Sequence, residues 1–119
     1  MSFTLKSQLQ YERDFCNLMD SLGHHAERVA ASGRRKNSVC DTVLLTSKST
    51  YLVEVRATKE KKYKLANLHG LVEVAKKFNI PSLIAVRFKG NCHLPGRWVH
   101  KVITNELSEV GFYDESDPI

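Results

Sequence analysis

Two short runs of β-branched and apolar residues, 42–46 and 51–57, flank a polar tetrapeptide, and this pattern constrains the fold more than any other in the chain. Runs of this kind are typical of β-strands, and the intervening Ser-Lys-Ser-Thr is typical of a turn. The sequence therefore predicts a β-hairpin in the first half of the chain.

The predicted hairpin brings two carboxylates onto one face. A turn of two or four residues, centred between residues 48 and 49, places Asp41 opposite Arg56 and Glu54 opposite Val43. The two acids are then diagonal neighbours, about 7–8 Å apart at the backbone, so both side chains can reach one cation. A turn of three or five residues would instead put the acids on opposite faces. The even-length turn gives the geometry of a metal site, and the alternative is an exposed ion-pair cluster around Arg56, worth less than about 1 kcal/mol.

Hydrophobic periodicity predicts two helices and three further strands around the hairpin. Residues 8–22 have the apolar spacing of a helix, with Ser7 and Gln10 placed as a capping box. Leucines at 65, 68 and 71 mark a second helix, which is expected to end near Asn79, and the apolar run that follows Pro81 is typical of a buried strand. Strands are expected at 25–30, 82–88 and 98–103, which gives an α/β layer architecture with a mixed sheet.

Positive charge is concentrated in the body of the chain. All 18 lysines and arginines, but only eight of the 13 acidic residues, lie within residues 1–105. Such a basic body attracts polyanions, which predicts binding to nucleic acid with a steep dependence on salt. A solvated basic surface is the alternative, and an RNA-binding module has only the charge in its favour. Residues 106–119 are expected to form an acidic, flexible tail.

Length and cysteine content limit the class of protein. At 119 residues the chain is expected to form one domain, 1–105, ahead of that tail. Neither a signal peptide nor a run of about 18 apolar residues is recognisable, which predicts an intracellular, cytoplasmic protein with no membrane partner. The three cysteines form no CxxC pair and are expected to be reduced, and the histidines lack a zinc-type spacing.

The second predicted helix has an unusually broad apolar face, which includes Leu71, Val74 and Phe78. A helix of this kind can pack on the sheet with one side and on a second subunit with the other. The sequence therefore predicts a homodimer whose interface contains these three residues.

Several short motifs follow one another in a recognisable order. They are Glu12-Arg13, Arg28 followed by Ser32-Gly33, Asp41, Glu54-Val55-Arg56, the helix at 71–78 with the strand at 85–88, and Trp98. This order resembles the archaeal-type Holliday junction resolvases of the PD-(D/E)xK nuclease superfamily. No single motif is specific, but together they cover about residues 10–103. The resemblance implies a restriction-endonuclease-like α/β fold, a central mixed five-stranded sheet flanked by helices.

The resemblance also implies a function, the metal-dependent cleavage of four-way DNA junctions by a homodimer during recombination or repair. It assigns catalytic roles to Glu12, Ser32, Asp41, Glu54 and Arg56. The implied metal is Mg²⁺, for which Mn²⁺ can substitute, held by Glu12, Asp41, Glu54 and the backbone carbonyl of Val55. The basic residues expected to bind DNA are Arg13, Arg28, Arg34, Arg35, Lys36, Lys59, Lys61, Lys62 and Lys64. By themselves, Glu12 could be an ordinary helix-edge acid and Ser32 an ordinary turn residue.

One position departs from the family pattern, because Arg56 stands where the resemblance has a catalytic lysine. Arginine supplies charge and hydrogen bonds, but with a pKa above about 12 it cannot act as a base. The leading hypothesis is a structure-selective endonuclease. The alternatives are another PD-(D/E)xK DNA endonuclease, and a weakened or inactive DNA-binding protein on the nuclease fold.

Overall fold

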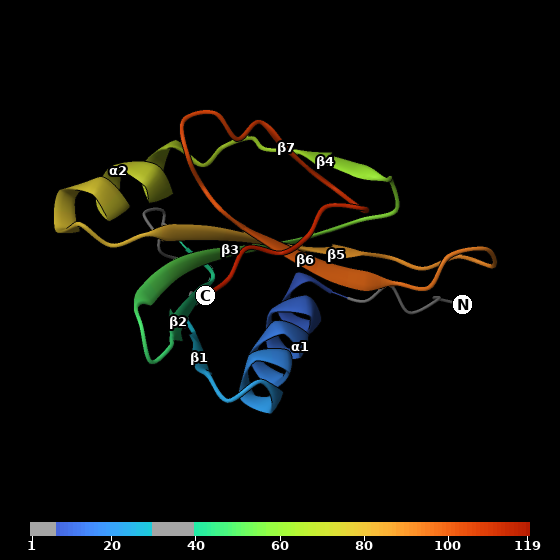
Figure 1. The fold of residues 1–119 in the computed structure, drawn as a ribbon, viewed down its shortest axis with the longest axis horizontal. Coiled ribbons are helices and arrows are strands. Elements are labelled where there is room, and N and C mark those ends of the chain that lie inside the picture. Colours follow the sequence, from blue (N-terminus) through green and yellow to red (C-terminus); the bar gives the residue numbers. More distant parts are fainter. Residues whose placement is uncertain (1–6, 30–39) are drawn as a thin grey trace.

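In the computed structural model the described residues are 7–29 and 40–119, and these form two helices and seven strands (Figure 1). The helices are α1 (Gln8–Ser21) and α2 (His69–Phe78), and within the described part of the chain neither has the length and apolar character needed to cross a membrane. The strands are β1 (His25–Arg28), β2 (Thr42–Leu45), β3 (Thr50–Thr58), β4 (Lys62–Lys64), β5 (Ser82–Phe88), β6 (Arg97–Val102) and β7 (Glu109–Gly111). Four residues with predicted roles, Ser32, Arg34, Arg35 and Lys36, lie outside the described residues.

Five strands form one mixed sheet in the order β1-β2-β3-β5-β6. β3 and β5 run parallel, and the other neighbouring strands are antiparallel. A parallel pair needs a long crossover, and the connection between β3 and β5 contains β4 and α2. The predicted architecture, a mixed five-stranded sheet flanked by helices, is confirmed.

The two faces of the sheet carry different layers. α1 covers one face, whereas α2 and the small β4-β7 sheet lie on the other side (Figure 1). The core under α1 contains Phe15, Met19, Leu44, Val53 and Val55, and the core on the opposite face contains Ile84, Val86, Phe88, Val99 and Val110. Because side chains alternate along a strand, Glu54 and Arg56 of β3 point away from the α1 side.

The N-terminus of α1 is fixed close to β3. Ser7 caps the helix by accepting a hydrogen bond from the Gln10 backbone N–H at 3.3 Å, as the capping pattern predicts. The side chain of Gln8 donates to the carbonyl oxygen of Val55 at 2.8 Å. The predicted helix is therefore confirmed to within one residue, and its first turn lies beside the strand that carries the predicted site.

α2 begins later than its leucine pattern suggests. Leu65 continues the extended chain from β4, because its N–H donates to Ser108 O at 3.0 Å. Asn67 has a φ of 61°, which breaks any helix before His69. The end of α2 agrees with the prediction, since Asn79 takes the left-handed conformation that stops a helix.

The residues after 105 belong to the fold, contrary to the predicted boundary. β7 pairs with β4, and Val110 is fully buried against the sheet. The last residues follow β6, where Asp117 accepts a hydrogen bond from the Val102 N–H at 2.7 Å and Ile119 packs against the α1-side core. The sequence predicted a flexible tail because the segment is acidic, but a few apolar side chains within it pack against the cores and hold it in place.

Candidate active site

The β2-β3 hairpin holds two acidic residues beside each other. Leu45 pairs with Thr50 and Thr42 with Val53, whereas Asp41 precedes β2 and its N–H donates to Val53 O at 3.0 Å. The predicted register is wrong by two residues, because Val43 pairs with Leu52 and not with Glu54. The cause is Thr46, whose hydroxyl accepts hydrogen bonds from Lys48 N and Ser49 N and so forms part of the turn. The shift is even, so the acids still share one face as predicted.

Arg56 completes the cluster from the same face of β3. Its Nη1 donates to Asp41 Oδ2 at 3.2 Å and to Val55 O at 2.9 Å, and its Nη2 donates to Glu54 Oε2. Asp41 Oδ2 also accepts the backbone N–H of Val55 at 2.9 Å, which fixes the carboxylate to β3. One guanidinium therefore binds both carboxylates and the carbonyl that were predicted to hold a metal ion.

Burial determines the charge of Glu54, whose side chain is only 9 % exposed. Removal from water, followed by repulsion from Asp41, raises the pKa of Glu54 to about 8, although the contact with Arg56 opposes the shift. The two influences on this carboxyl disagree in sign, and burial beside a second carboxylate is the stronger. Such a pair favours a proton or a cation between the acids.

Glu12 lies on α1, and Gln8 connects it to this cluster. It is buried, and it accepts hydrogen bonds from Arg28 Nε at 3.2 Å and from Gln8 Nε2 at 3.1 Å. Gln8 also donates to Val55 O, so it links Glu12 to the carbonyl beside the acid pair. No group of three or more His, Cys, Asp or Glu side chains placed to hold a metal occurs among residues 7–29 and 40–119. The metal-ligand role of Glu12 stays a prediction.

Gln8 is a site residue that sequence reasoning did not identify. The available signal was its position one helical turn before Glu12, at the i, i+4 spacing that lets side chains meet. Because a glutamine at this spacing is common in exposed helices, the contact with Val55 becomes visible only when α1 is placed against β3.

The predicted DNA-binding cations that the structure describes differ in their availability. Arg28 is tied to Glu12, whereas Arg13 on α1 is exposed. Lys59, Lys61, Lys62 and Lys64 are exposed as well, around β4, and Lys62 forms a 3.4 Å ion pair with Glu109. These cations lie on two separate elements, α1 and the segment after β3.

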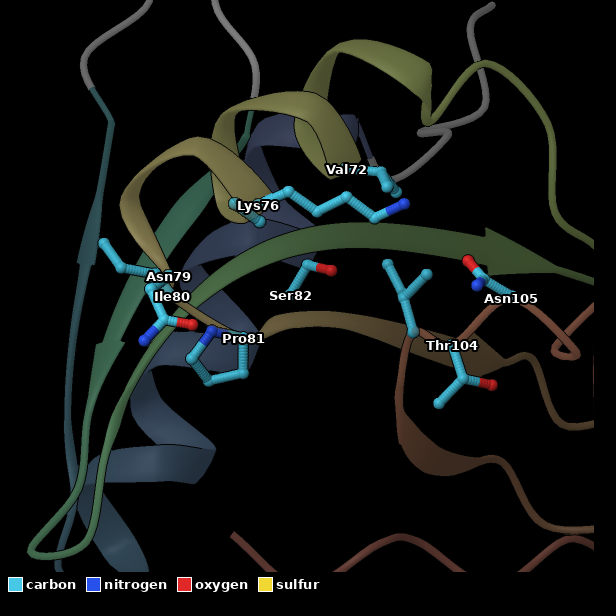
Figure 2. A pocket seen from close by; sticks show the side chains of 10 residues that line it. Val72, Lys76, Asn79, Ile80, Pro81, Ser82, Thr104 and Asn105 are labelled. Carbon is cyan, nitrogen blue, oxygen red and sulfur yellow. The ribbon is translucent and has the colours of Figure 1, made fainter.

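The residues predicted for the dimer interface do not all remain accessible. Leu71 is buried within the chain, Val74 is half-buried, and Phe78 is 61 % exposed with Lys77 Nζ 5.4 Å from its ring centroid. Beside the same helix is a cavity of about 380 Å³. Figure 2 shows the labelled side chains that line it, among them Lys76, Ser82 and Thr104. Its lining includes no acidic residue and none of the acid cluster.

Comparison with known proteins places the fold in a class and the chain in a family. The structure resembles that of Archaeoglobus fulgidus Hjc, described as a Holliday junction resolvase from an archaeal hyperthermophile, with a TM-score of 0.66 and 23% sequence identity over 86% of this chain and 85% of that one. The fold is thus that of the PD-(D/E)xK nucleases.

A family model described as archaeal Holliday junction resolvase (Hjc) matches residues 6–113. The chain belongs to the archaeal Holliday junction resolvase family. A search of curated proteins found no match.

Proposed function

We propose that this protein is a structure-selective endodeoxyribonuclease that resolves four-way DNA junctions by metal-dependent phosphodiester hydrolysis, acting as a homodimer. The family supports junction resolution. The main support for metal-dependent hydrolysis is that Asp41, Glu54 and the Val55 carbonyl all contact one positive group, the Arg56 guanidinium.

The oxygen groups of this cluster fit a divalent cation. Two carboxylates and a backbone carbonyl are hard donors of the kind that Mg²⁺ and Mn²⁺ prefer. The Arg56 guanidinium serves as a stand-in ion, because it bonds all three groups at once. We assign Asp41, Glu54 and Val55 O as the groups that would hold the metal, with Glu12 contributing through water. A bound Mg²⁺ would polarise a water molecule and neutralise charge on the scissile phosphate.

The protein's own residues orient the acid pair and stabilise charge on the phosphate. Asp41 is oriented by the Val55 N–H, and Glu54 is held in a buried position beside it. Arg56 donates hydrogen bonds to the phosphate that is attacked, where its fixed positive charge stabilises the added negative charge. It takes no proton from water, because arginine does not lose its own. Ser32 is proposed to contact the DNA backbone.

Exposed cations on α1 and after β3 suit recognition of DNA by shape. Arg13 and the lysines of residues 59–64 can reach phosphates, and none of the predicted cations belongs to a base-reading motif. Arg28, Arg34, Arg35 and Lys36 are proposed to extend this surface. A dimer through Val74 and Phe78 would present two such sites to the two strands that must be cut symmetrically.

A specific observation favours a second candidate, a junction-binding protein with little catalytic activity. Arg56 replaces the family's lysine, and in the structure it is bound to the acids themselves. A protein of this kind would bind junctions tightly and leave them uncut, and Arg56→Lys would restore cleavage.

A panel of labelled DNAs tests the proposal and separates the candidates. Four-way junctions, flaps and linear duplexes are incubated with the protein in Mg²⁺, in Mn²⁺ and in EDTA. Selective nicking of the four-way junction, lost in EDTA, is the expected result. Equal cutting of flaps or duplex indicates another nuclease of this superfamily, and binding without cutting indicates the second candidate.

A further inference from the structure

The Arg56 guanidinium forms an ion pair with each of the two acids of the cluster. It makes hydrogen bonds to Asp41, to Glu54 and to the carbonyl of Val55, which are the groups assigned to the metal. A planar guanidinium can reach several acceptors at once, whereas the ammonium of a lysine acts as a point charge. This multiple contact is therefore a property of the arginine in this chain.

A metal ion and Arg56 would compete for the same oxygen atoms. A carbonyl oxygen has two lone pairs, and Val55 O already accepts from Arg56 Nη1 at 2.9 Å and from Gln8 Nε2 at 2.8 Å. Asp41 Oδ2 likewise accepts from Arg56 Nη1 and from the Val55 N–H. A cation that used these oxygens would have to displace one of the two donors at each, and the guanidinium is the donor whose like charge the cation repels.

The Arg56 side chain can move toward solvent when a metal ion displaces it. Its side chain is 29 % exposed, more than the 9 % of its partner Glu54, so it lies at the outer edge of the cluster. Within residues 7–29 and 40–119, the acceptors bonded to the guanidinium are Asp41, Glu54 and the carbonyl of Val55, whereas a DNA phosphate would supply new acceptors for a bidentate guanidinium.

We propose that Arg56 is an internal counter-cation which a divalent metal must displace, and that the DNA phosphate receives the displaced guanidinium. The inference rests on the proposed function and specifies how its site is regulated. Metal and DNA then bind cooperatively, because each favours the same position of Arg56 and such coupling is reciprocal. The free protein holds metal weakly until DNA is present.

Calcium binding to the DNA-free protein tests the displacement. Isothermal titration calorimetry compares the wild type with Arg56→Gln, Arg56→Lys and the control Lys48→Gln, which removes the same charge at the exposed far end of the hairpin. Arg56→Gln is expected to bind Ca²⁺ about tenfold or more tightly than wild type, with Arg56→Lys between them and Lys48→Gln unchanged.

Nuclear magnetic resonance of the wild type gives a readout that does not depend on a substitution. The Arg56 Nε–Hε signal, assigned by its loss in Arg56→Lys, is expected to shift with Ca²⁺ in proportion to the calorimetric saturation. A signal that stays in place while Ca²⁺ binds, or equal affinities in wild type and Arg56→Gln, would overturn the displacement and leave the metal site standing. Absence of Ca²⁺ binding in every variant, even with junction DNA present, would overturn both this inference and the metal-dependent function.

Discussion

At the scale of single residues, the environment of Glu54 decides how the acid cluster responds to pH. The carboxyl is buried beside Asp41, and its pKa is raised from 4.5 to about 8. Between these two values the folded protein keeps a proton that the unfolded chain has released. Its stability therefore falls as the pH rises through this window, in the absence of a divalent cation.

Glu54→Gln tests this behaviour, because glutamine cannot ionise. We compare the melting temperature of Glu54→Gln with that of wild type at two pH values. The difference, mutant minus wild type, should be larger at pH 9 than at pH 5, since only the wild type carries the buried negative charge at high pH. Thermal denaturation in EDTA at both pH values measures it, with the exposed Glu106→Gln as the control. A difference that is the same at both pH values would contradict the raised pKa.

Thr42, next to Asp41, carries an unusual stability cost. Its hydroxyl is buried and has no hydrogen-bond partner, and no other buried side-chain N or O atom of the described residues is in this state. Thr42→Val replaces the hydroxyl by a methyl of similar shape and should stabilise the protein by about 1 kcal/mol. The matched change Thr46→Val removes a hydroxyl that bonds the turn and should destabilise by a similar amount. Urea denaturation of both variants measures the pair, and destabilisation by Thr42→Val would show that its hydroxyl is satisfied.

The residues of the cluster could be predicted from the sequence, but their partners could not. Alternation along two strands fixes which residues share a face, so Asp41, Glu54 and Arg56 were placed together correctly. The opposite partner depends on where the turn begins, and the hydroxyl of Thr46 moves that point by one residue on each strand. Gln8 could not be found because its contact joins α1 to β3, residues 47 apart in the chain.

At the scale of elements, the C-terminal segment closes the outer edge of the sheet. Asp117 accepts from Val102 N at 2.7 Å and pairs with Lys101 at 3.3 Å, while Ser116 Oγ accepts from His100 N at 3.0 Å. Such contacts satisfy the backbone of an edge strand that would otherwise be open to other chains.

Asp117→Ala should therefore destabilise the protein by about 1–2 kcal/mol, because it leaves the Val102 N–H without its acceptor. The neighbouring Glu115→Ala, at an exposed position, provides the control. Denaturant unfolding compares the two. Equal stabilities would mean that the Asp117 carboxylate contributes nothing to the edge of β6.

Elements rich in apolar residues were easier to predict than those held by distant contacts. β5 was predicted to the residue, because seven consecutive positions match a buried strand. β4 and β7 were missed, since each has three residues and one inward apolar side chain, Tyr63 or Val110, and each exists only because it pairs with the other.

At the scale of the whole molecule, Val74 and Phe78 are the two residues of the predicted dimer interface that remain accessible on α2. Phe78→Asp is expected to convert a dimer into a monomer, because it places a charge in the apolar contact. Light scattering over a range of concentrations measures the mass, and Leu22→Asp, at another exposed apolar residue, is the control. A wild-type protein that is monomeric at every concentration would refute the proposed dimer.

The measurement that tests the central claim most directly is the cleavage rate of a labelled, mobile four-way junction in Mg²⁺ at enzyme excess. Wild type is compared with Asp41→Asn, which keeps the shape of the cluster and removes a charge, and with Asp20→Asn, an exposed control on α1. We expect paired, symmetric nicks from wild type and Asp20→Asn, and a loss of about 100-fold or more in Asp41→Asn. Nicks of equal rate from Asp41→Asn, or an uncut junction with wild type and Arg56→Lys alike, would contradict a resolvase whose site is this acid pair.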